Sequence, residues 1–454
     1  MTDTIAHNPA APTPLASHGA DRLAGRFVTP ADRSIAGLAL ALGALTVGRT
    51  TIEGGRLTDD IVILMTALRQ LGVGIETQDR LWHVHGLGVG GLLAPETPIN
   101  LGTSPLAARL LLGLLAPHAF EVRLEGDASV RPVLAPLLDA LAPLGLEVFD
   151  ATDGALPLSL RGPSLPVPFQ KELAAPSEAI KTVCLLAAAQ VAGTSIVVEP
   201  ASGCDHIEKL LALFGAGISV VHDDASRATV SINGLTELKP HHVLVPGDPS
   251  AAAYPLVAAL VVPGSDLLVE NVLVNPARTG LIDTLLEMGG DIQFLNQREI
   301  GGEHVADLRV RSSRLKGIRV SADHAAAMLD DIPVLAMAAA CAHGETVIEG
   351  LAALREGSCD RLALTAAGLA ISKVTVAEGD SALTIGGDGK VPGGGAVHSH
   401  GDHQVAASFL VLGLASKQAI TLDDTSGIAA HLPDFMPAMA AIGATFQPVK
   451  DTTP

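Results

Sequence analysis

The sequence predicts an α/β protein built from six repeated modules, and two series of residues indicate it. A short β-branched run that ends in an acidic residue recurs at intervals of 71 to 79 residues, with the acids at Glu53, Glu125, Glu199, Glu270, Glu349 and Asp423. A helix-like run that closes on glycine follows it with a similar spacing, at Gly72, Gly145, Gly215, Gly289, Gly368 and Gly443. Fixed self-similarity of this kind indicates a repeated supersecondary unit. Six modules divide most simply into two lobes of three, although the spacing does not show which modules pair.

Each module shows the same order of elements. The acid-ending strand is followed by an amphipathic helix, as at 59–72, whose final glycine suits the left-handed position after a helix. One or two short strands come next, and then an Ala/Leu-rich helix that is apolar on all sides. Such a helix is expected to be buried, so the pattern predicts helices that lie inside the sheets. The apolar runs span 107–116, 179–192, 252–262, 332–342 and 404–415.

Composition narrows the possible partners and locations. The formal net charge of the 454 residues is −19, which argues against nucleic acid or an anionic membrane as a partner. No apolar run reaches the roughly 18 residues of a membrane span, and the N-terminus lacks the basic start and apolar segment of a secretory signal. The four cysteines show no C-x-x-C spacing, which argues against a metal cage or a disulfide framework. We therefore expect a cytoplasmic protein.

Several strings together resemble one known family. They are PADRSIAGLAL, GDASVRP, LVPGDPSAAAYPLVAALVVPGSD, NVLVNPARTGLIDTLLEMGGDI, GGEHVADLRVRSS, MLDDIPVLAMAAA, CDRL and GDHQVAASFLVLG. This set is similar to the 5-enolpyruvylshikimate-3-phosphate (EPSP) synthase family, or 3-phosphoshikimate 1-carboxyvinyltransferase, and most closely to its glyphosate-insensitive class. The resemblance runs from about Leu23 to Phe446 and covers nearly the whole chain.

The resemblance implies the enolpyruvyl transferase fold, with two lobes that are each an inside-out α/β barrel of three units. It also implies a small-molecule ligand in the cleft between the lobes, no cofactor and a monomer. We expect a disordered tail at 1–18, a first lobe from 19–33 and 248–446, a second lobe from 34–247, and a tail at 447–454.

The family joins phosphoenolpyruvate to the 5-hydroxyl of shikimate-3-phosphate and releases phosphate. Each ligand carries a phosphate and a carboxylate, so the site needs several Lys and Arg side chains, together with groups that move protons. Matching the family's motifs one position at a time gives candidate catalytic residues Arg33, Asp330 and His403. The same matching gives candidate substrate-binding residues Ser34, Thr103, Ser104, Arg131, Ser177, Arg361 and Gln404.

This sequence departs from the family at several of those positions. Arg33 replaces a catalytic Lys and can hardly exchange a proton. The N-A-x-T loop has become 103–106, and a ligand-binding Gln has become Ala179. Uncharged residues replace four cations and one acid, namely Leu38, Cys204, Gly357 and Gln404 for the cations and Ser358 for a Glu. Loss of one partner of a desolvated charge pair costs roughly 2–5 kcal/mol, so efficient synthesis of the family's product is not expected.

Three functional hypotheses remain open. The first is a diverged enzyme that acts on a less anionic small molecule; the second is a non-catalytic relative that binds a ligand or a partner. The third is a weak but genuine 3-phosphoshikimate 1-carboxyvinyltransferase. The retained Arg131, Asp330 and Arg361 could also be structural ion pairs. The histidine-rich run 398–403 lacks a second cluster of metal ligands, so a glycine-rich loop is favoured there and no metal site is predicted.

Overall fold

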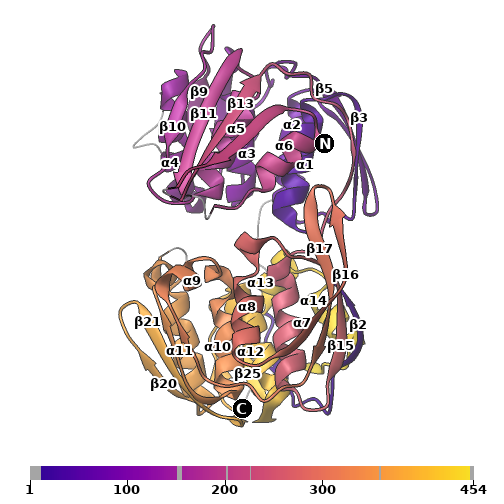
Figure 1. The fold of residues 1–454 in the computed structure, drawn as a ribbon, viewed down its shortest axis with the longest axis vertical. Helices are drawn as coiled ribbons and strands as arrows, with labels where there is room; N and C mark the ends of the chain where they lie inside the picture. Colours follow the sequence, from indigo (N-terminus) through magenta and orange to yellow (C-terminus); the bar gives the residue numbers. More distant parts are fainter. Residues whose placement is uncertain (1–11, 151–155, 201–202, 225, 357–358, 450–454) are drawn as a thin grey trace. The chain divides into compact units, whose positions relative to one another are not determined.

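The computed structural model describes residues 12–150, 156–200, 203–224, 226–356 and 359–449 (Figure 1). The chain forms two compact units. The described residues of unit 1 lie within 1–29, 249–297 and 306–454, and those of unit 2 lie within 30–248 and 298–305. Residues 30–33, which were predicted to belong to the first lobe, belong to unit 2. The Asp32 N–H donates to the Pro246 carbonyl at 2.8 Å, and Arg33 is the first residue of a helix of that unit.

Unit 2 repeats one sheet pattern three times. The first edge pair of each sheet is parallel, and the remaining pairs are antiparallel. In sheet order the strands are β14 (His242–Leu244), β3 (Val47–Glu53), β5 (Leu81–Leu87) and β4 (Gly74–Gln78); β6 (Ile99–Asn100), β7 (Glu121–Glu125), β9 (Leu158–Arg161) and β8 (Glu147–Phe149); and β10 (Gln170–Glu172), β11 (Gly193–Pro200), β13 (Arg227–Gly234) and β12 (Gly217–His222). The helices are α1 (Arg33–Ala44), α2 (Asp59–Gln70), α3 (Pro105–Leu115), α4 (Arg131–Leu141), α5 (Glu178–Ala188) and α6 (His206–Leu213), with 3₁₀ turns η1 (Ala128–Val130) and η2 (Ala142–Leu144).

The described residues of unit 1 form three four-stranded sheets and a two-stranded one. In sheet order the strands are β16 (Asp291–Ile300), β17 (Glu303–Arg311), β15 (Asp266–Leu273) and β2 (Ala24–Val28); β18 (Arg319–Val320), β19 (His343–Glu349), β21 (Ala382–Asp388) and β20 (Thr375–Glu378); β23 (Ala396–Val397), β25 (Ile420–Leu422), β1 (Leu15–Ser17) and β26 (Phe446–Pro448); and β22 (Val391–Gly393) with β24 (Ser416–Gln418). The helices are α7 (Pro249–Val261), α8 (Gly280–Glu287), α9 (Ala322–Ala326), α10 (Ile332–Cys341), α11 (Arg361–Ile371), α12 (His403–Ala415), α13 (Ser426–His431) and α14 (Phe435–Ala441), with 3₁₀ turns η3 (Pro276–Arg278), η4 (Leu329–Asp331) and η5 (Ala352–Arg355).

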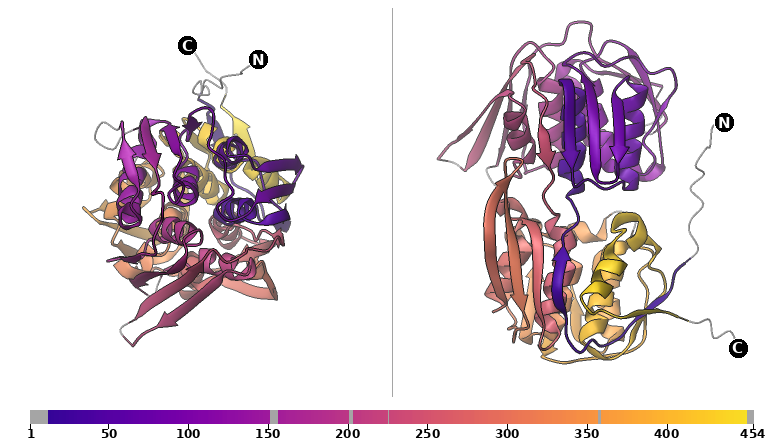
Figure 2. Two further views of the ribbon diagram at one scale, coloured as in Figure 1. Left: turned by 90° about the horizontal axis from the view of Figure 1, so that it is seen from above. Right: turned by 90° about the vertical axis from the view of Figure 1, so that its right-hand side faces the viewer.

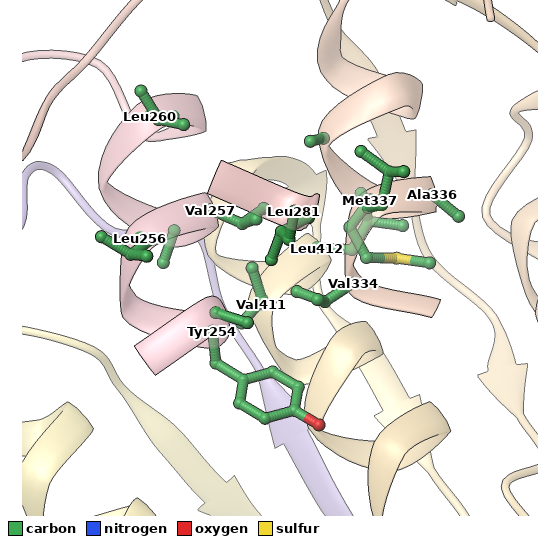
Figure 3. Packing of buried hydrophobic residues seen from close by; sticks show 14 of the residues in the cluster. Tyr254, Leu256, Val257, Leu260, Leu281, Val334, Ala336, Met337, Val411 and Leu412 are labelled. Carbon is green, nitrogen blue, oxygen red and sulfur yellow. The ribbon is translucent and has the colours of Figure 1, made fainter. Parts of the chain in front are cut away.

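In each unit the sheets surround a set of buried helices (Figure 2). All residues of α10 except the last are buried, and α10 packs against α7 and α12. Figure 3 shows these three helices meeting through side chains such as Val257, Met337 and Val411. In unit 2, α3 packs against α1 and α5 in the same way. The predicted burial of the apolar helices is therefore confirmed.

Five of the six acidic residues of the repeats lie on strands, as the spacing predicted, and the sixth, Asp423, directly follows β25. Glu53, Glu125 and Glu349 are the last residues of β3, β7 and β19. Five of the six repeated glycines adopt a positive φ, as predicted for residues that follow a helix. Gly368 is the exception, because it lies inside α11. A Cβ at that position would lie 2.2 Å from Cζ of Phe409, so this glycine permits close packing of α11 on α12.

The predicted tails are shorter than expected. Residues 15–17 form β1, which pairs antiparallel with both β25 and β26, and residues 447–448 belong to β26. The Ser17 hydroxyl also donates to the Leu410 carbonyl at 2.6 Å. Residues 1–11 and 450–454 lie outside the described part of the chain. Among the described residues, no helix combines the length and the apolar character that crossing a bilayer requires.

Candidate functional site

Most candidate residues lie at the amino-terminal ends of helices. Arg33, Arg131, Arg361 and His403 are the first residues of α1, α4, α11 and α12. Ser104 and Ser177 are the N-caps of α3 and α5, and Asp330 lies in η4 directly before α10. The free N–H groups and the helix dipole at such ends favour ligands with oxygen acceptors or negative charge. Each unit therefore provides several helix ends with polar side chains.

In unit 2, Arg33, Asp60 and Ser104 form one connected group, the unit 2 cluster. Arg33 Nη1 lies 3.3 Å from Asp60 Oδ2, and the Ser104 hydroxyl donates to Asp60 Oδ1 at 2.5 Å. Ser104 is buried, and its Oγ also accepts from the Ala107 N–H, as a helix cap does. Asp60 therefore balances the charge of Arg33 and joins two of the predicted residues, although sequence reasoning did not name it.

The other candidates in unit 2 have separate positions. Ser177 caps α5 by accepting from the Ile180 N–H at 3.3 Å. Ser34 is partly exposed in the first turn of α1, while Thr103 and the Arg131 residue are exposed. Ser177 and Ser104 thus have structural roles as caps, which leaves Ser34, Thr103 and Arg131 with side chains that solvent or a ligand can reach.

Three positions in unit 2 where the family has a cation or an amide carry an uncharged residue, namely Leu38, Cys204 and Ala179. Leu38 is fully buried in α1, where it is part of the apolar core. Cys204 is half-buried just before α6, and Ala179 is half-buried in the first turn of α5. Burial of a leucine side chain stabilises a fold by about 1.5–3 kcal/mol, so Leu38 has a packing role in place of a binding role.

In unit 1, Asp330, Cys359, Arg361 and Asp402 form a second connected group, the unit 1 cluster. Arg361 Nε donates to Asp402 Oδ2 at 2.8 Å, and Arg361 Nη1 lies 3.5 Å from Asp330 Oδ1. The Cys359 thiol lies 3.6 Å from the same Asp402 oxygen. Asp402 Oδ1 caps α12 by accepting from the N–H groups of residues 404 and 405.

These contacts explain the pKa shifts in the unit 1 cluster. Burial alone would raise the pKa of Asp402, but backbone N–H groups and Arg361 outweigh it and lower that pKa. Burial would lower the pKa of Arg361, but Asp402 and Asp330 raise it. Arg361 therefore stays charged, with Asp402 bound to it, while the Asp330 side chain is 68% exposed and open to solvent.

The remaining unit 1 candidates flank this cluster. The rings of His403 and His431 stack with centroids 4.2 Å apart. The Gln404 residue is 8% exposed, and its Oε1 is buried without a hydrogen-bond partner in the described part of the chain. Gly357 and Ser358, the other two replaced positions, lie outside the described residues. His398 in the histidine-rich run pairs with Asp423, at 3.3 Å from Nδ1 to Oδ2.

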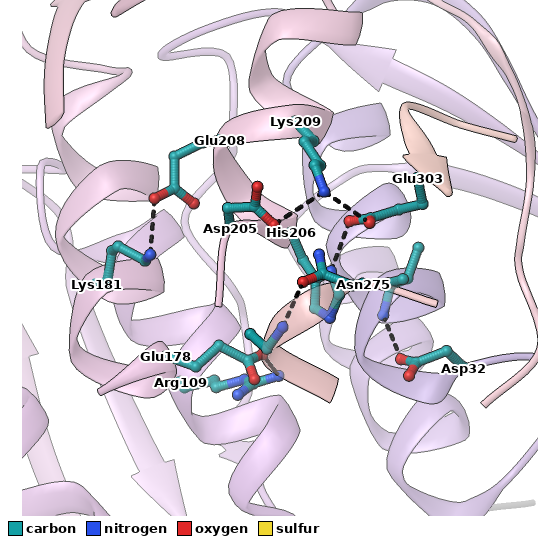
Figure 4. A network of polar contacts seen from close by, with 12 residues as sticks. Asp32, Arg109, Glu178, Lys181, Asp205, His206, Glu208, Lys209, Asn275 and Glu303 are labelled. Carbon is teal, nitrogen blue, oxygen red and sulfur yellow. Dashed lines mark hydrogen bonds and ion pairs between the residues drawn. The ribbon is translucent and has the colours of Figure 1, made fainter. Parts of the chain in front are cut away.

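Sequence reasoning missed a polar group in unit 2 that consists of Asp205, His206, Lys209 and Glu303, the Glu303 cluster (Figure 4). His206 Nδ1 lies 2.6 Å from Glu303 Oε1. Lys209 Nζ lies 3.0 Å from both Glu303 Oε2 and Asp205 Oδ1. Burial would lower the pKa of His206, but Cys204 and Glu303 raise it to about 10. The string GCDH at 203–206 was the sequence feature that could have indicated this group. Glu303, however, is 97 residues away from His206, so the string alone did not reveal its partner.

A second buried ionic group lies beside the same loop. Lys181 Nζ lies 2.5 Å from Glu199 Oε1 and 2.7 Å from Glu208 Oε1, with all three side chains buried. A Cβ on Gly203 would lie 2.4 Å from Glu199 Oε1, so the chain leading to Cys204 runs against this carboxylate and only glycine fits there.

Comparison with known proteins agrees with these features. A sequence profile described as EPSP synthase (3-phosphoshikimate 1-carboxyvinyltransferase) matches residues 17–439. A 3-phosphoshikimate 1-carboxyvinyltransferase of Chelativorans sp. is 44% identical over 439 residues, which cover 96% of this chain and 98% of the relative. One of Parvibaculum lavamentivorans is also 44% identical, over 95% of this chain and 96% of the relative.

Solved structures show the same similarity. An EPSP synthase from Acinetobacter baumannii superposes with a TM-score of 0.88 at 32% identity, covering 97% of this chain and all of that one. The enolpyruvyl transferase NikO from Streptomyces tendae superposes with a TM-score of 0.76 at 19% identity, over 96% of this chain and 99% of that one, which shows a shared fold. The predicted enolpyruvyl transferase fold is confirmed, and the chain belongs to the EPSP synthase (3-phosphoshikimate 1-carboxyvinyltransferase) family.

Proposed function

We propose that the chain is a diverged transferase of this family whose substrate carries fewer anionic groups than shikimate-3-phosphate. The observation that carries the proposal is the pairing of two candidate-site arginines, Arg33 and Arg361, with carboxylates. Arg33 is paired with Asp60, so the charges of the unit 2 cluster sum to zero. Arg361 lies between Asp330 and Asp402, so the charges of the unit 1 cluster sum to minus one when both acids are ionised. Clusters with these net charges attract a multiply charged anion weakly.

The replaced positions support the same proposal. The buried Leu38 packs in the core, and the half-buried Cys204 and the buried Gln404 offer polar or polarisable groups without charge. The helix ends remain, and they can still bind a hydroxyl, a carbonyl or a single carboxylate. Asp330 and His403 supply groups that could move protons during transfer. A neutral or singly charged acceptor alcohol is the substrate class that fits these residues.

A second candidate function is a genuine 3-phosphoshikimate 1-carboxyvinyltransferase. The names of relatives that are 44% identical over nearly the whole chain favour it. In that case Arg33 and Arg361 would have to exchange their carboxylate partners for the anionic substrates. The two candidates therefore differ in whether the protein turns over the family's substrates at an appreciable rate.

Phosphate release from phosphoenolpyruvate and shikimate-3-phosphate by the purified full chain tests the proposal. Two uncompensated charge losses, at Cys204 and Gln404, cost at least about 4 kcal/mol together, or a factor of about 10³ in rate. We expect turnover at least ~10³ below that of a genuine synthase assayed in parallel. Turnover within about tenfold of the synthase would contradict the proposal and establish the second candidate.

Calorimetry and two variants extend this test. We expect shikimate-3-phosphate to bind weakly to the wild-type protein and more tightly after Cys204→Arg or Gln404→Arg, because each variant returns a cation to a position where the family has one. Cys184→Ser, a change of a buried core cysteine, is the matched control and should leave binding unchanged. Tight binding without turnover in the wild-type protein would instead favour a non-catalytic binding role.

A further inference from the structure

The Glu303 cluster contains a set of metal-ligating groups that the proposed function does not use. One ligand atom from each of Asp205, His206 and Glu303 lies within 4.8 Å of the other two. All three residues belong to unit 2, with Asp205 and His206 at the start of α6. Glu303 is the first residue of β17, and it lies in the segment 298–305, the part of the β16–β17 pair that belongs to unit 2. An imidazole with two carboxylates is a donor set that suits Zn²⁺ and similar ions.

We propose that Asp205, His206 and Glu303 bind a divalent transition-metal ion of the zinc type, in exchange for the Lys209 ammonium and for the proton on the ligating nitrogen of His206, which is released to solvent. Ligands about 2.1 Å from a tetrahedral zinc lie about 3.4 Å apart, so the three groups need to shift by about 1 Å. The Glu303 and His206 side chains are buried, whereas 46% of the Asp205 side chain is exposed. An ion can therefore reach the site from the solvent side of Asp205.

The surroundings of the His206 ring also fit a ligating imidazole. Its ring is fully buried, and its Nε2 has no formed hydrogen bond within the described part of the chain. The Cys204 thiol is the neighbouring group that interacts with the ring. In zinc sites the second nitrogen of a ligating imidazole usually faces an acceptor, and the thiol or thiolate of Cys204 is placed to serve as one.

Lys209 shows that the site already holds a cation. Its ammonium is 3.0 Å from one oxygen of each carboxylate, which is a position that a metal ion would take. The Lys209 side chain is 22% exposed and flexible, so it can turn into solvent when a metal ion binds. The ammonium and the imidazole proton together carry two positive charges, and a divalent ion replaces both beside the two carboxylates.

The experiment measures Zn²⁺ binding to the full chain, purified free of metal, by titration calorimetry and by equilibrium dialysis with metal analysis. We expect one equivalent to bind. Lys209→Met should tighten binding by at least about 10-fold, because it removes a like charge at about 4 Å. Asp205→Asn should weaken binding by about 10- to 100-fold or more, since loss of even a supporting group costs that much.

Matched controls come from the Lys171–Asp139 pair of the same unit. The Lys171 side chain is also 22% exposed, and it binds a single carboxylate at 3.0 Å. Lys171→Met and Asp139→Asn should leave Zn²⁺ binding unchanged, and the emission of buried Trp82 verifies that each variant is folded. Absence of saturable binding in both the wild type and Lys209→Met would overturn the proposal. Unchanged affinity in Asp205→Asn would also overturn it, because the ion would then bind elsewhere. No substrate is involved, so the result is independent of the proposed function.

Discussion

Replacement of Lys181 by Met tests how unit 2 holds a positive charge in its interior. The Lys181 side chain is 1% exposed and contacts the carboxylates of Glu199 and Glu208. Burial alone would lower the pKa of Lys181, but the two carboxylates outweigh burial and raise it. The Oε2 atom of each carboxylate is buried without a hydrogen-bond partner among the described residues, so each acid depends on the ammonium through its other oxygen.

Lys181→Met should therefore lower the free energy of unfolding of unit 2 by about 3–5 kcal/mol, the usual cost of removing one partner from a buried ion pair. The same change in a protein that also carries Glu199→Gln and Glu208→Gln should cost much less, because no buried carboxylate is then left without a cation. Lys171→Met is the control, since a partly exposed pair contributes only about 0–1 kcal/mol.

Urea unfolding followed by tryptophan emission provides the assay. The single tryptophan, Trp82, is fully buried in unit 2, so its emission reports the unfolding of that unit separately from unit 1. A loss below about 1 kcal/mol in Lys181→Met would refute the reasoning, since the larger cost arises only if the three charges are truly desolvated. A triple variant as unstable as the single one would refute it as well, because the cost would then come from packing and not from charge.

Three further predictions concern other parts of the chain. Gly368→Ala should destabilise unit 1 by about 1–3 kcal/mol, because the added methyl group overpacks against Phe409. A midpoint of thermal unfolding equal to that of the wild type would contradict this, since it would show that α11 can shift freely. Asp402 has a lowered pKa, so its contribution to stability is present above its unfolded pKa of about 3.9 and is lost as the pH falls through its lower folded value. Asp402→Asn should therefore remove this pH dependence from the acid-unfolding curve. Identical curves for the wild type and the variant would contradict the prediction. Burial raises the pKa of Cys184 to about 12, so a thiol reagent should label the half-buried Cys204 before Cys184 in the native protein. Mass spectrometry of the labelled peptides measures the order, and earlier labelling of Cys184 would contradict the prediction.

Local patterns predicted the elements of the fold because helices and strands depend on neighbouring residues. The buried α10 followed from an apolar run without polar breaks, and the end of β3 followed from the T-x-I-E string at Glu53. Gly368 shows the limit of such patterns, since it resembles the other repeat glycines in sequence. Its role depends on a ring of α12, which the local pattern around Gly368 does not contain.

The candidate site was predictable only as a set of single residues. Motif matching found Arg33 and Arg361, but their partners Asp60 and Asp402 depend on how distant segments pack. The same reason hid the contact of His206 with Glu303. A charge that looks available in the sequence can be neutralised in the structure, and this difference decides how strongly an anion is attracted.

The early strand β1 has a consequence for how the protein is made. Its neighbours β25 and β26 come from the other end of the chain, and the adjacent Thr13 N–H donates to Asp424 at a separation of 411 residues. During synthesis the ribosome therefore releases an interior strand of one unit 1 sheet first and the two strands that flank it last. Residues 30–248 of unit 2 emerge in between and can collapse while β1 still waits for its partners. We expect a nascent chain that is stopped before residue 420 to leave the backbone groups of β1 without their strand partners. A chaperone would matter most at this stage of synthesis.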